Sequence, residues 1–169
     1  VVRAENSFIG VEGVGEATER KLWDAGVTHW DEFDGAVVGE TLADRIAAFV
    51  DDATDRLQRG EARFFGERFP DAEHWRLYEN FRGQACFFDI ETTGLDQHSN
   101  RVTTVSAHRG GETTTLVRGD DLTSENLADL LDAPLLVTFN GRRFDVPFLE
   151  ESFDVDVDAP HVDLMYPCK

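Results

Sequence analysis

Residues 86–95, with the sequence Cys-Phe-Phe-Asp-Ile-Glu-Thr-Thr-Gly-Leu, constrain the fold more than any other stretch of this chain. The three apolar residues at its start predict the end of a buried strand. Asp89 and Glu91 follow at a spacing of two, so an extended backbone points both carboxylates to the same side. Two like charges beside an apolar core are unfavourable unless they are paired, protonated or bound to a metal. The stretch therefore predicts a strand end with hard oxygen ligands for Mg²⁺ or Mn²⁺.

A second stretch, residues 137–149, follows another predicted buried strand and ends in an apolar run. Asp145 is predicted to open a helix there, where the N-terminal dipole favours an anion and its metal. Phe144 would anchor that helix, and Asn140 would contact a substrate or fix the loop. Each stretch alone has a simpler interpretation: Asp-x-Glu as two solvated acids, and Asp145 as an ordinary N-cap. Neither of these explains why the two stretches occur together.

The two stretches resemble the first and second exonuclease motifs of the DnaQ-like nucleases, which have the ribonuclease H-like fold. The second motif has the form Asn-x-x-x-Phe-Asp-x-x-Phe-Leu, and it is matched by Asn140, Phe144, Asp145, Phe148 and Leu149. From a Gly-Val-Gly hairpin near the start to His161-Val-Asp-Leu164, the chain is similar to the YprB-like members of this DEDD group. The resemblance implies a 3′→5′ exonuclease that hydrolyses DNA or RNA with two metal ions.

The resemblance also implies which residues act. Asp89 would bridge two Mg²⁺ or Mn²⁺ ions, Glu91 would ligate one of them, and Asp145 would hold the second. These three acids would be both the metal ligands and the catalytic residues, and the partner would be the single-stranded 3′ end of a nucleic acid. The substrate-binding residues implied by the two motifs are Thr92, Leu95, Asn140, Arg143 and Phe144.

A third motif of the family, Tyr-x-x-x-Asp or His-x-x-x-x-Asp, does not follow Asp145. His161 and Asp163 have the wrong spacing for it and are predicted to form a last short strand. We therefore expect a C-terminally truncated protein that lacks a fourth carboxylate and a general base and is nearly inactive. One alternative is a nucleic-acid-binding or assembly module that has lost catalysis. Another is an aspartyl-phosphate hydrolase, which would need an aspartate where Glu91 stands.

The expected fold is an α/β ribonuclease H-like domain over residues 83–169, incomplete at its C-terminus, with a mixed sheet and flanking helices. After the first strand, residues 102–108 and 113–117 are predicted to complete an antiparallel meander around a Gly-Gly turn. A helix that starts at Thr123 or Ser124 then leads to a buried strand over residues 135–139, which pairs in parallel.

Residues 1–82 are predicted to form a separate helical region. A helix over residues 16–25, and a second short helix opened by Thr28 with Asp31 as its capping partner, resemble the second half of a helix-hairpin-helix element. Such hairpins bind phosphate through main-chain N–H groups, although a purely structural hairpin is an equal alternative. Further helices are predicted over residues 41–59, over residues 61–69 and from residue 71 onward. The aromatic residues of the last one either stack on bases or, as we favour, pack against the following domain.

Charge and composition exclude some classes of protein. The chain has 34 acids against 16 bases, a net charge of −18, and its only lysines are Lys21 and Lys169. This composition resembles that of proteins from salt-accumulating archaea, where molar salt shortens the Debye length to about 3 Å and an acidic surface tolerates nucleic acid. Arg142 and Arg143 either meet phosphates or form a solvated pair. No apolar run is long enough to span a membrane, so we expect no membrane partner. Two cysteines are too few for a disulfide framework and suit a reducing cytoplasm. No protein partner is predicted.

Overall fold

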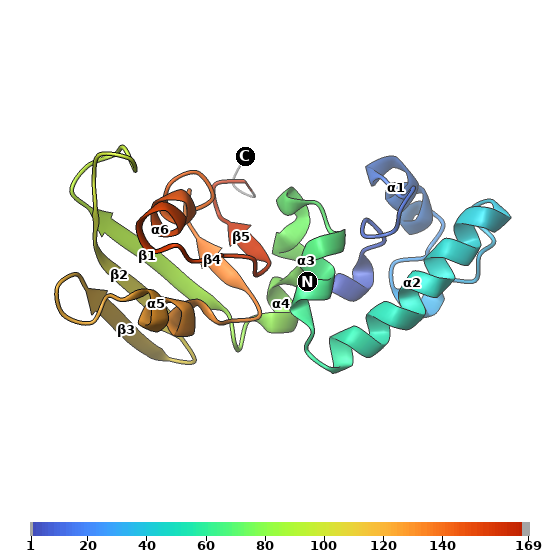
Figure 1. Ribbon diagram of the computed structural model, residues 1–169. Coiled ribbons are helices and arrows are strands. Elements are labelled where there is room, and N and C mark those ends of the chain that lie inside the picture. The colour runs from blue at the N-terminus through green and yellow to red at the C-terminus, as the bar shows by residue number, and fades with distance from the viewer. Residues whose placement is uncertain (1, 167–169) are drawn as a thin grey trace.

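The computed structural model describes residues 2–166, which form a five-stranded sheet and a helical segment beside it (Figure 1). The strands are β1 (Cys86–Thr92), β2 (Val102–Arg109), β3 (Glu112–Val117), β4 (Leu136–Thr138) and β5 (His161–Asp163). The α-helices are α1 (Glu16–Asp24), α2 (Glu40–Gln58), α3 (Ala62–Arg68), α4 (Tyr78–Phe81), α5 (Ser124–Leu131) and α6 (Asp145–Phe153). Three 3₁₀ helices are η1 (Ala4–Asn6), η2 (Trp30–Glu32) and η3 (Asp71–Leu77).

The strand order confirms the predicted fold class. The sheet has the order β3-β2-β1-β4-β5, in which β1, β2 and β3 form an antiparallel meander. Strands β4 and β5 then extend the sheet in parallel with β1. This mixed sheet with flanking helices is the ribonuclease H-like arrangement, and its last strand, β5, is the short strand predicted around His161.

Helices α5 and α6 cover one face of the sheet (Figure 1). Strand β1 alternates buried and exposed positions, so Phe88 and Ile90 point into this core while Phe87, Asp89 and Glu91 point to the opposite face. The prediction that Phe87 belongs to a buried run is wrong, since this side chain is 37% exposed. The period of two in an extended strand overrides the apolar run.

The helical segment packs against the opposite face of the sheet, near β4 and β5. Its core is continuous with Val137 of β4 and Val162 of β5. Tyr78 meets Phe87 edge-on with ring centroids 6.3 Å apart, and Phe81 is buried in the shared core. These contacts confirm the packing interpretation for Tyr78 and Phe81, whereas Trp75 is 36% exposed. The boundary between residues 82 and 83 stays a prediction, because the two parts share one interior.

The predicted helical hairpin near the N-terminus differs from the expectation in its second half. The second short helix is only the three-residue η2, and its capping pair is His29 with Glu32 rather than Thr28 with Asp31. The Glu32 carboxylate accepts hydrogen bonds from the main-chain N–H and the hydroxyl of Thr28 at 2.7 and 2.9 Å. Phosphate binding by this hairpin stays a prediction.

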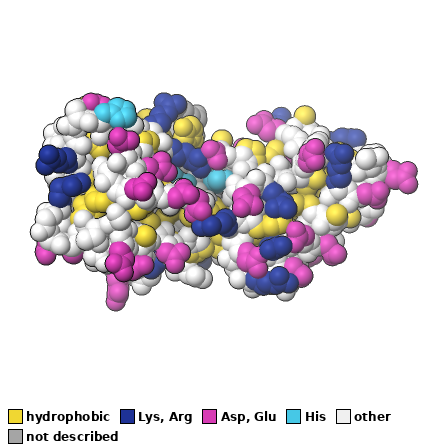
Figure 2. All heavy atoms as spheres, in the orientation of Figure 1, with side chains coloured by type: hydrophobic (Ala, Val, Ile, Leu, Met, Phe, Trp, Pro, Cys, Tyr) yellow, Lys and Arg dark blue, Asp and Glu magenta, His cyan; other side chains and the backbone are white. Residues whose placement is uncertain are grey.

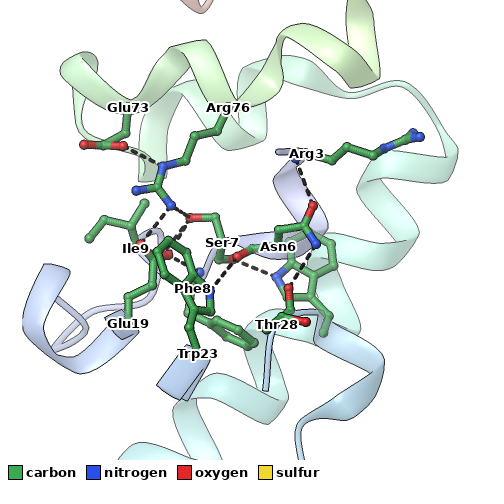
Figure 3. A network of polar contacts seen from close by, with 11 residues as sticks. Arg3, Asn6, Ser7, Phe8, Ile9, Glu19, Trp23, Thr28, Glu73 and Arg76 are labelled. Atoms are coloured by element: carbon green, nitrogen blue, oxygen red, sulfur yellow. Dashed lines mark hydrogen bonds and ion pairs between the residues drawn. The ribbon is translucent and has the colours of Figure 1, made fainter. Parts of the chain in front are cut away.

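A buried ion pair fixes the start of the chain to η3 (Figure 3). Glu19 of α1, which is 1% exposed, lies 2.8 Å from the guanidinium of Arg76. The other oxygen of Glu19 accepts hydrogen bonds from the Ser7 hydroxyl and from the main-chain N–H groups of Phe8 and Ile9. Glu19 therefore joins three parts of the helical segment.

Within residues 2–166, no helix combines the length and the apolarity that a membrane crossing requires.

Candidate active site

Asp145 lies at the first position of α6 and reaches the middle of β1. Asp145 is only 3% exposed. One of its carboxylate oxygens accepts a hydrogen bond of 3.2 Å from the main-chain N–H of Ile90. The pairing between β1 and β4 involves Cys86 and Phe87, so Ile90 lies beyond it. Asp145 therefore takes the acceptor position that a longer β4 would supply, and it lies beside the residue between Asp89 and Glu91.

The surroundings of Asp145 disfavour its charge. Burial raises the pKa of Asp145 to about 6, and the negative charge of Asp89 adds to the increase. The hydrogen bond from Ile90 opposes the shift, because it stabilises the ionised carboxylate. A pair of carboxylates with one pKa raised is an arrangement that a divalent cation would relieve.

Asp89 and Glu91 lie on the same face of β1, as their spacing predicts, and their partners across β2 are Ser106 and Thr104. Both acids belong to exposed residues. However, within the part of the chain that the structure describes, no group of three or more His, Cys, Asp or Glu residues is placed to hold a metal ion. The structure therefore brings Asp145 to Asp89, whereas it does not assemble Asp89, Glu91 and Asp145 into one compact ligand set.

The candidate substrate-binding residues lie at the end of β1 and in the two loops that follow β1 and β4, which are neighbouring parallel strands. The hydroxyl of Thr92, the last residue of β1, donates to the carbonyl of Gly94 in the first loop at 2.6 Å, and Leu95 in this loop is 85% exposed. In the second loop, Asn140 has a left-handed backbone with φ 63°, and Arg143 is exposed. Since the carboxyl ends of parallel strands meet at one edge, both loops border the same end of the sheet.

Phe144 immediately precedes α6 and packs on the next turn of the helix. Its ring centroid lies 4.9 Å from that of Phe148, which is buried in the core beneath α6. This contact anchors the start of the helix, as the sequence predicts for the residue before Asp145. Because Phe144 is only half-buried, part of its ring faces away from the core.

Asp163 of β5 is a functional candidate in the structure, although its spacing from His161 is wrong for the third motif. This residue is 3% exposed, and its carboxylate accepts three main-chain hydrogen bonds: from Asn140 at 2.7 Å, from Arg142 at 3.1 Å and from Met165 at 3.0 Å. Two of these donors belong to the loop that leads to Asp145. An acid inside a predicted short strand was the available signal, since a carboxylate that a sheet buries needs partners.

The side chain of Arg142 is neither free to contact a phosphate nor part of a solvated pair, because it is engaged within the protein. Its guanidinium forms an ion pair of 2.5 Å with Asp71 and hydrogen bonds with the carbonyl of His161 at 3.0 Å and with Nδ1 of His74 at 3.1 Å. Burial and the charge of Arg142 lower the pKa of both histidines, that of His161 to about 4. Arg142 therefore ties η3 to the site loop, and Arg143 remains the exposed arginine of the pair.

An apolar groove opens beside Asp89 on the face of the sheet away from α5 and α6. Phe87, Phe139 and Leu164 line it and are 37%, 66% and 40% exposed. Acidic side chains are scattered over the visible surface of the molecule, with basic ones between them (Figure 2). Beside Asp89, the site therefore combines a carboxylate with exposed apolar side chains.

The strand order and the flanking helices give this part of the molecule a ribonuclease H-like fold. The family model of the RNase_H superfamily matches residues 86–169, which begin at the first residue of β1. No curated protein matches the chain.

Three solved structures are similar to part of this chain. A family B DNA polymerase from the hyperthermophilic archaeon Pyrobaculum calidifontis is 21% identical with a TM-score of 0.40, and the match covers 49% of this chain and 15% of the polymerase. A nuclease in its apo form is 26% identical with a TM-score of 0.39, over 47% of this chain and 40% of that chain. Brucella melitensis NrnC with bound Mg²⁺ is 26% identical with a TM-score of 0.34, over 45% and 39%. The matched part thus spans less than half the length of each of these proteins.

Proposed function

We propose that this chain is the ribonuclease H-like part of a metal-dependent 3′→5′ exonuclease that hydrolyses DNA or RNA from a single-stranded 3′ end. One observation carries the proposal: the buried carboxylate of Asp145 is held at Ile90, beside Asp89, in the middle of the central strand. The match of residues 86–169 to the RNase_H superfamily supports it.

Asp89 and Asp145 suit a divalent cation. They offer hard oxygen donors, and a positive ion would offset the burial and the charge of Asp89 that raise the pKa of Asp145. Mg²⁺ commonly takes one or two carboxylates and completes its shell with water and substrate phosphates, so two acids suffice for one ion. Glu91, on the same face as Asp89, would serve the second ion. When bound, two Mg²⁺ or Mn²⁺ ions would activate a water molecule and stabilise the leaving 3′ oxygen.

The other site residues would bind and orient the nucleotide. Arg143 is exposed in the loop before Asp145 and would meet a backbone phosphate, since a guanidinium suits phosphate geometry. Leu95 and Phe144 present apolar surface at the same end of the sheet and would contact the terminal base or sugar. Thr92 and Asn140 would shape the two loops.

We further propose that this chain turns over slowly, because the described residues bring no third acid to Asp89 and Asp145 in a metal-holding group. The test is digestion of a single-stranded oligonucleotide, labelled at its 3′ or its 5′ end, with Mn²⁺ in molar salt. We expect weak, metal-dependent shortening from the 3′ end that Asp89→Asn and Asp145→Asn abolish. Asp129→Asn, which changes an exposed acid of α5, is the matched control.

Three outcomes would contradict parts of this proposal. Cleavage that persists in the presence of a chelator, or in Asp89→Asn, would refute the site. Shortening from the 5′ end would refute the direction. Fast turnover by the unmodified chain would refute the proposed weakness.

A nucleic-acid-binding module without catalysis is the second candidate, and it is favoured by the lack of a three-ligand group among residues 2–166. It predicts binding of a single strand that Arg143→Ala weakens, together with no binding of Mn²⁺ at Asp89 and Asp145. The exonuclease proposal predicts that Mn²⁺ binds there.

A further inference from the structure

We propose that Asp163 is a positioning residue, whose carboxylate holds the loop between β4 and α6 in the shape that places Asp145 against Ile90. The inference rests on the proposed function, since it assigns a role at the same site. It differs from the metal-ligand roles of Asp89, Glu91 and Asp145, because the hydrogen bonds that Asp163 accepts come from main-chain N–H groups.

The contacts of Asp163 are those of a clamp. One carboxylate oxygen accepts from the N–H groups of Asn140 at 2.7 Å and Met165 at 3.0 Å, and the other accepts from the N–H of Arg142 at 3.1 Å. The residue is 3% exposed, so water does not compete for these bonds. Breaking them would leave buried donors without partners, which costs more than the bonds themselves contribute.

The loop held by this clamp is short and constrained. Gly141 donates its N–H to the Thr138 hydroxyl at 3.1 Å, and a Cβ atom built on Gly141 would lie 2.2 Å from that hydroxyl oxygen. Asn140 adopts a left-handed backbone with φ 63°, which is unfavourable for most residues without such support. Three consecutive residues are therefore fixed, and only Arg143 and Phe144 separate them from Asp145.

The loop continues directly into the helix that carries the catalytic acid. The N–H groups of Arg143 and Phe144 donate to the carbonyl of Asn140, and the N–H of Val146 donates to the carbonyl of Gly141 at 2.8 Å. A shift of the clamped residues would therefore move the first turn of α6. Asp145 is the first residue of that turn, and its contact with Ile90 depends on the same geometry.

The carboxylate chemistry is specific. In Asp163→Asn the side chain keeps its shape and one acceptor oxygen, while its amide group would point hydrogen atoms at an N–H donor. The substitution therefore removes the clamp from at least one loop residue. Asp156→Asn changes an exposed acid in the segment before β5 and is the matched control.

The experiment is amide hydrogen exchange followed residue by residue by NMR, without metal. In the unmodified protein we expect the amides of Asn140 and Arg142 to exchange as slowly as those of the sheet, although they lie in a loop. In Asp163→Asn they should exchange about tenfold faster or more. The amide of Ile90 should accelerate with them, whereas Asp156→Asn should change none of the three.

Two results in this experiment would overturn the proposal. Fast exchange of Asn140 and Arg142 in the unmodified protein would show that no clamp exists, and this measurement holds even if Asp163→Asn does not fold. Accelerated loop amides with an unchanged Ile90 amide would show that Asp163 stabilises the loop without positioning Asp145.

A Mn²⁺ titration separates this inference from the proposed function. If the unmodified protein binds Mn²⁺ at Asp89 and Asp145, Asp163→Asn should bind it about tenfold more weakly, in the range of effects seen for groups that orient metal ligands. Equal affinity would overturn the positioning role and leave the proposed function standing. If the unmodified protein binds no Mn²⁺, the proposed function fails, and the Ile90 amide alone decides whether Asp163 positions Asp145.

Discussion

The carboxylate of Asp145 accepts a hydrogen bond of 3.2 Å from the main-chain N–H of Ile90, 55 residues earlier in the chain. This contact places the acid of one motif beside Asp89 of the other, and it does so inside the protein. A metal-free protein must then keep a partly desolvated carboxylate next to Asp89. The same arrangement that suits a cation therefore lowers the stability of the protein without one.

Asp145→Asn should stabilise the metal-free protein at pH 7.5. The pKa of Asp145 is raised from 3.8 to about 6, so the folded state loses stability as the pH rises through that value. A shift of this size corresponds to about 2–3 kcal/mol in the free energy of unfolding once the group is ionised in both states. An asparagine carries no charge and can still accept the hydrogen bond from Ile90. Urea unfolding in the presence of a chelator measures the gain.

At pH 3.5 the two proteins should be equally stable, because Asp145 is then mostly protonated when folded. The exposed acid substitution Asp156→Asn should leave stability unchanged within about 0.5 kcal/mol at both pH values. A loss of stability in Asp145→Asn at pH 7.5 would show that the carboxylate is not under the repulsion inferred from its surroundings.

The buried His161 should make the protein sensitive to acid. Its pKa is lowered from 6.5 to about 4, so the unfolded chain binds a proton between these values that the folded protein does not. The neutral His161 therefore contributes about 3 kcal/mol to the free energy of unfolding. This contribution is fully present above pH 6.5 and is lost as the pH falls from 6.5 to about 4. In His161→Gln the free energy of unfolding should fall less steeply between pH 7 and 4 than in the unmodified protein. The exposed substitution His98→Gln should leave the slope unchanged, and an unchanged slope in His161→Gln would refute the assignment.

Removing Glu19 should destabilise the helical segment strongly. Glu19→Ala leaves Arg76 with only Glu73 as its acidic partner and removes the acceptor for the N–H groups of Phe8 and Ile9. Breaking one side of a buried ion pair costs about 3–5 kcal/mol. Chemical denaturation measures the effect.

The matched control for Glu19 is Glu16→Ala, which removes an exposed acid from the first turn of the same helix. It should cost about 1 kcal/mol or less. Equal effects of the two substitutions would show that the buried ion pair contributes no more than a surface charge.

Arg142 and Arg143 should separate into a structural and a substrate-binding residue. Arg142→Ala removes the ion pair with Asp71 and the contacts to His74 and His161, and it should cost about 2–3 kcal/mol of stability. Arg143→Ala should leave stability unchanged and weaken the binding of a single strand, with a smaller dependence of affinity on salt. Thermal unfolding and fluorescence anisotropy of a labelled oligonucleotide check both. The reverse assignment would follow if Arg142→Ala were the variant that binds weakly while staying stable.

The order of the strands was predictable because alternation and turn residues are local signals. The short strand at His161 and the helix that begins at Asp145 occur where the sequence predicts them. The exposure of Phe87 was not predicted, since a run of three apolar residues hides the period of two. The packing that selects one face for this residue comes from Tyr78 in the helical segment.

The roles of several charged residues could not be predicted, because their partners are distant in sequence. Glu19 resembles any acid of an exposed helix until Arg76, 57 residues later, is brought to it. Arg142 lies one residue from Arg143, and only its contact with His74 decides between a structural and a phosphate-binding role. The spacing of Asp163 does not fit the third motif. Its hydrogen bonds come from main-chain N–H groups, and a sequence motif gives no information about such contacts.

The most direct test of the metal site is a titration with Mn²⁺ followed by the broadening of amide signals in NMR spectra. We expect the signals of Asp89, Ile90 and Asp145 to disappear first. We also expect this effect to be lost in Asp89→Asn and kept in Asp129→Asn. The proposed site would be contradicted if the signals of scattered surface acids broadened first and those of Asp89, Ile90 and Asp145 stayed sharp at the end of the titration.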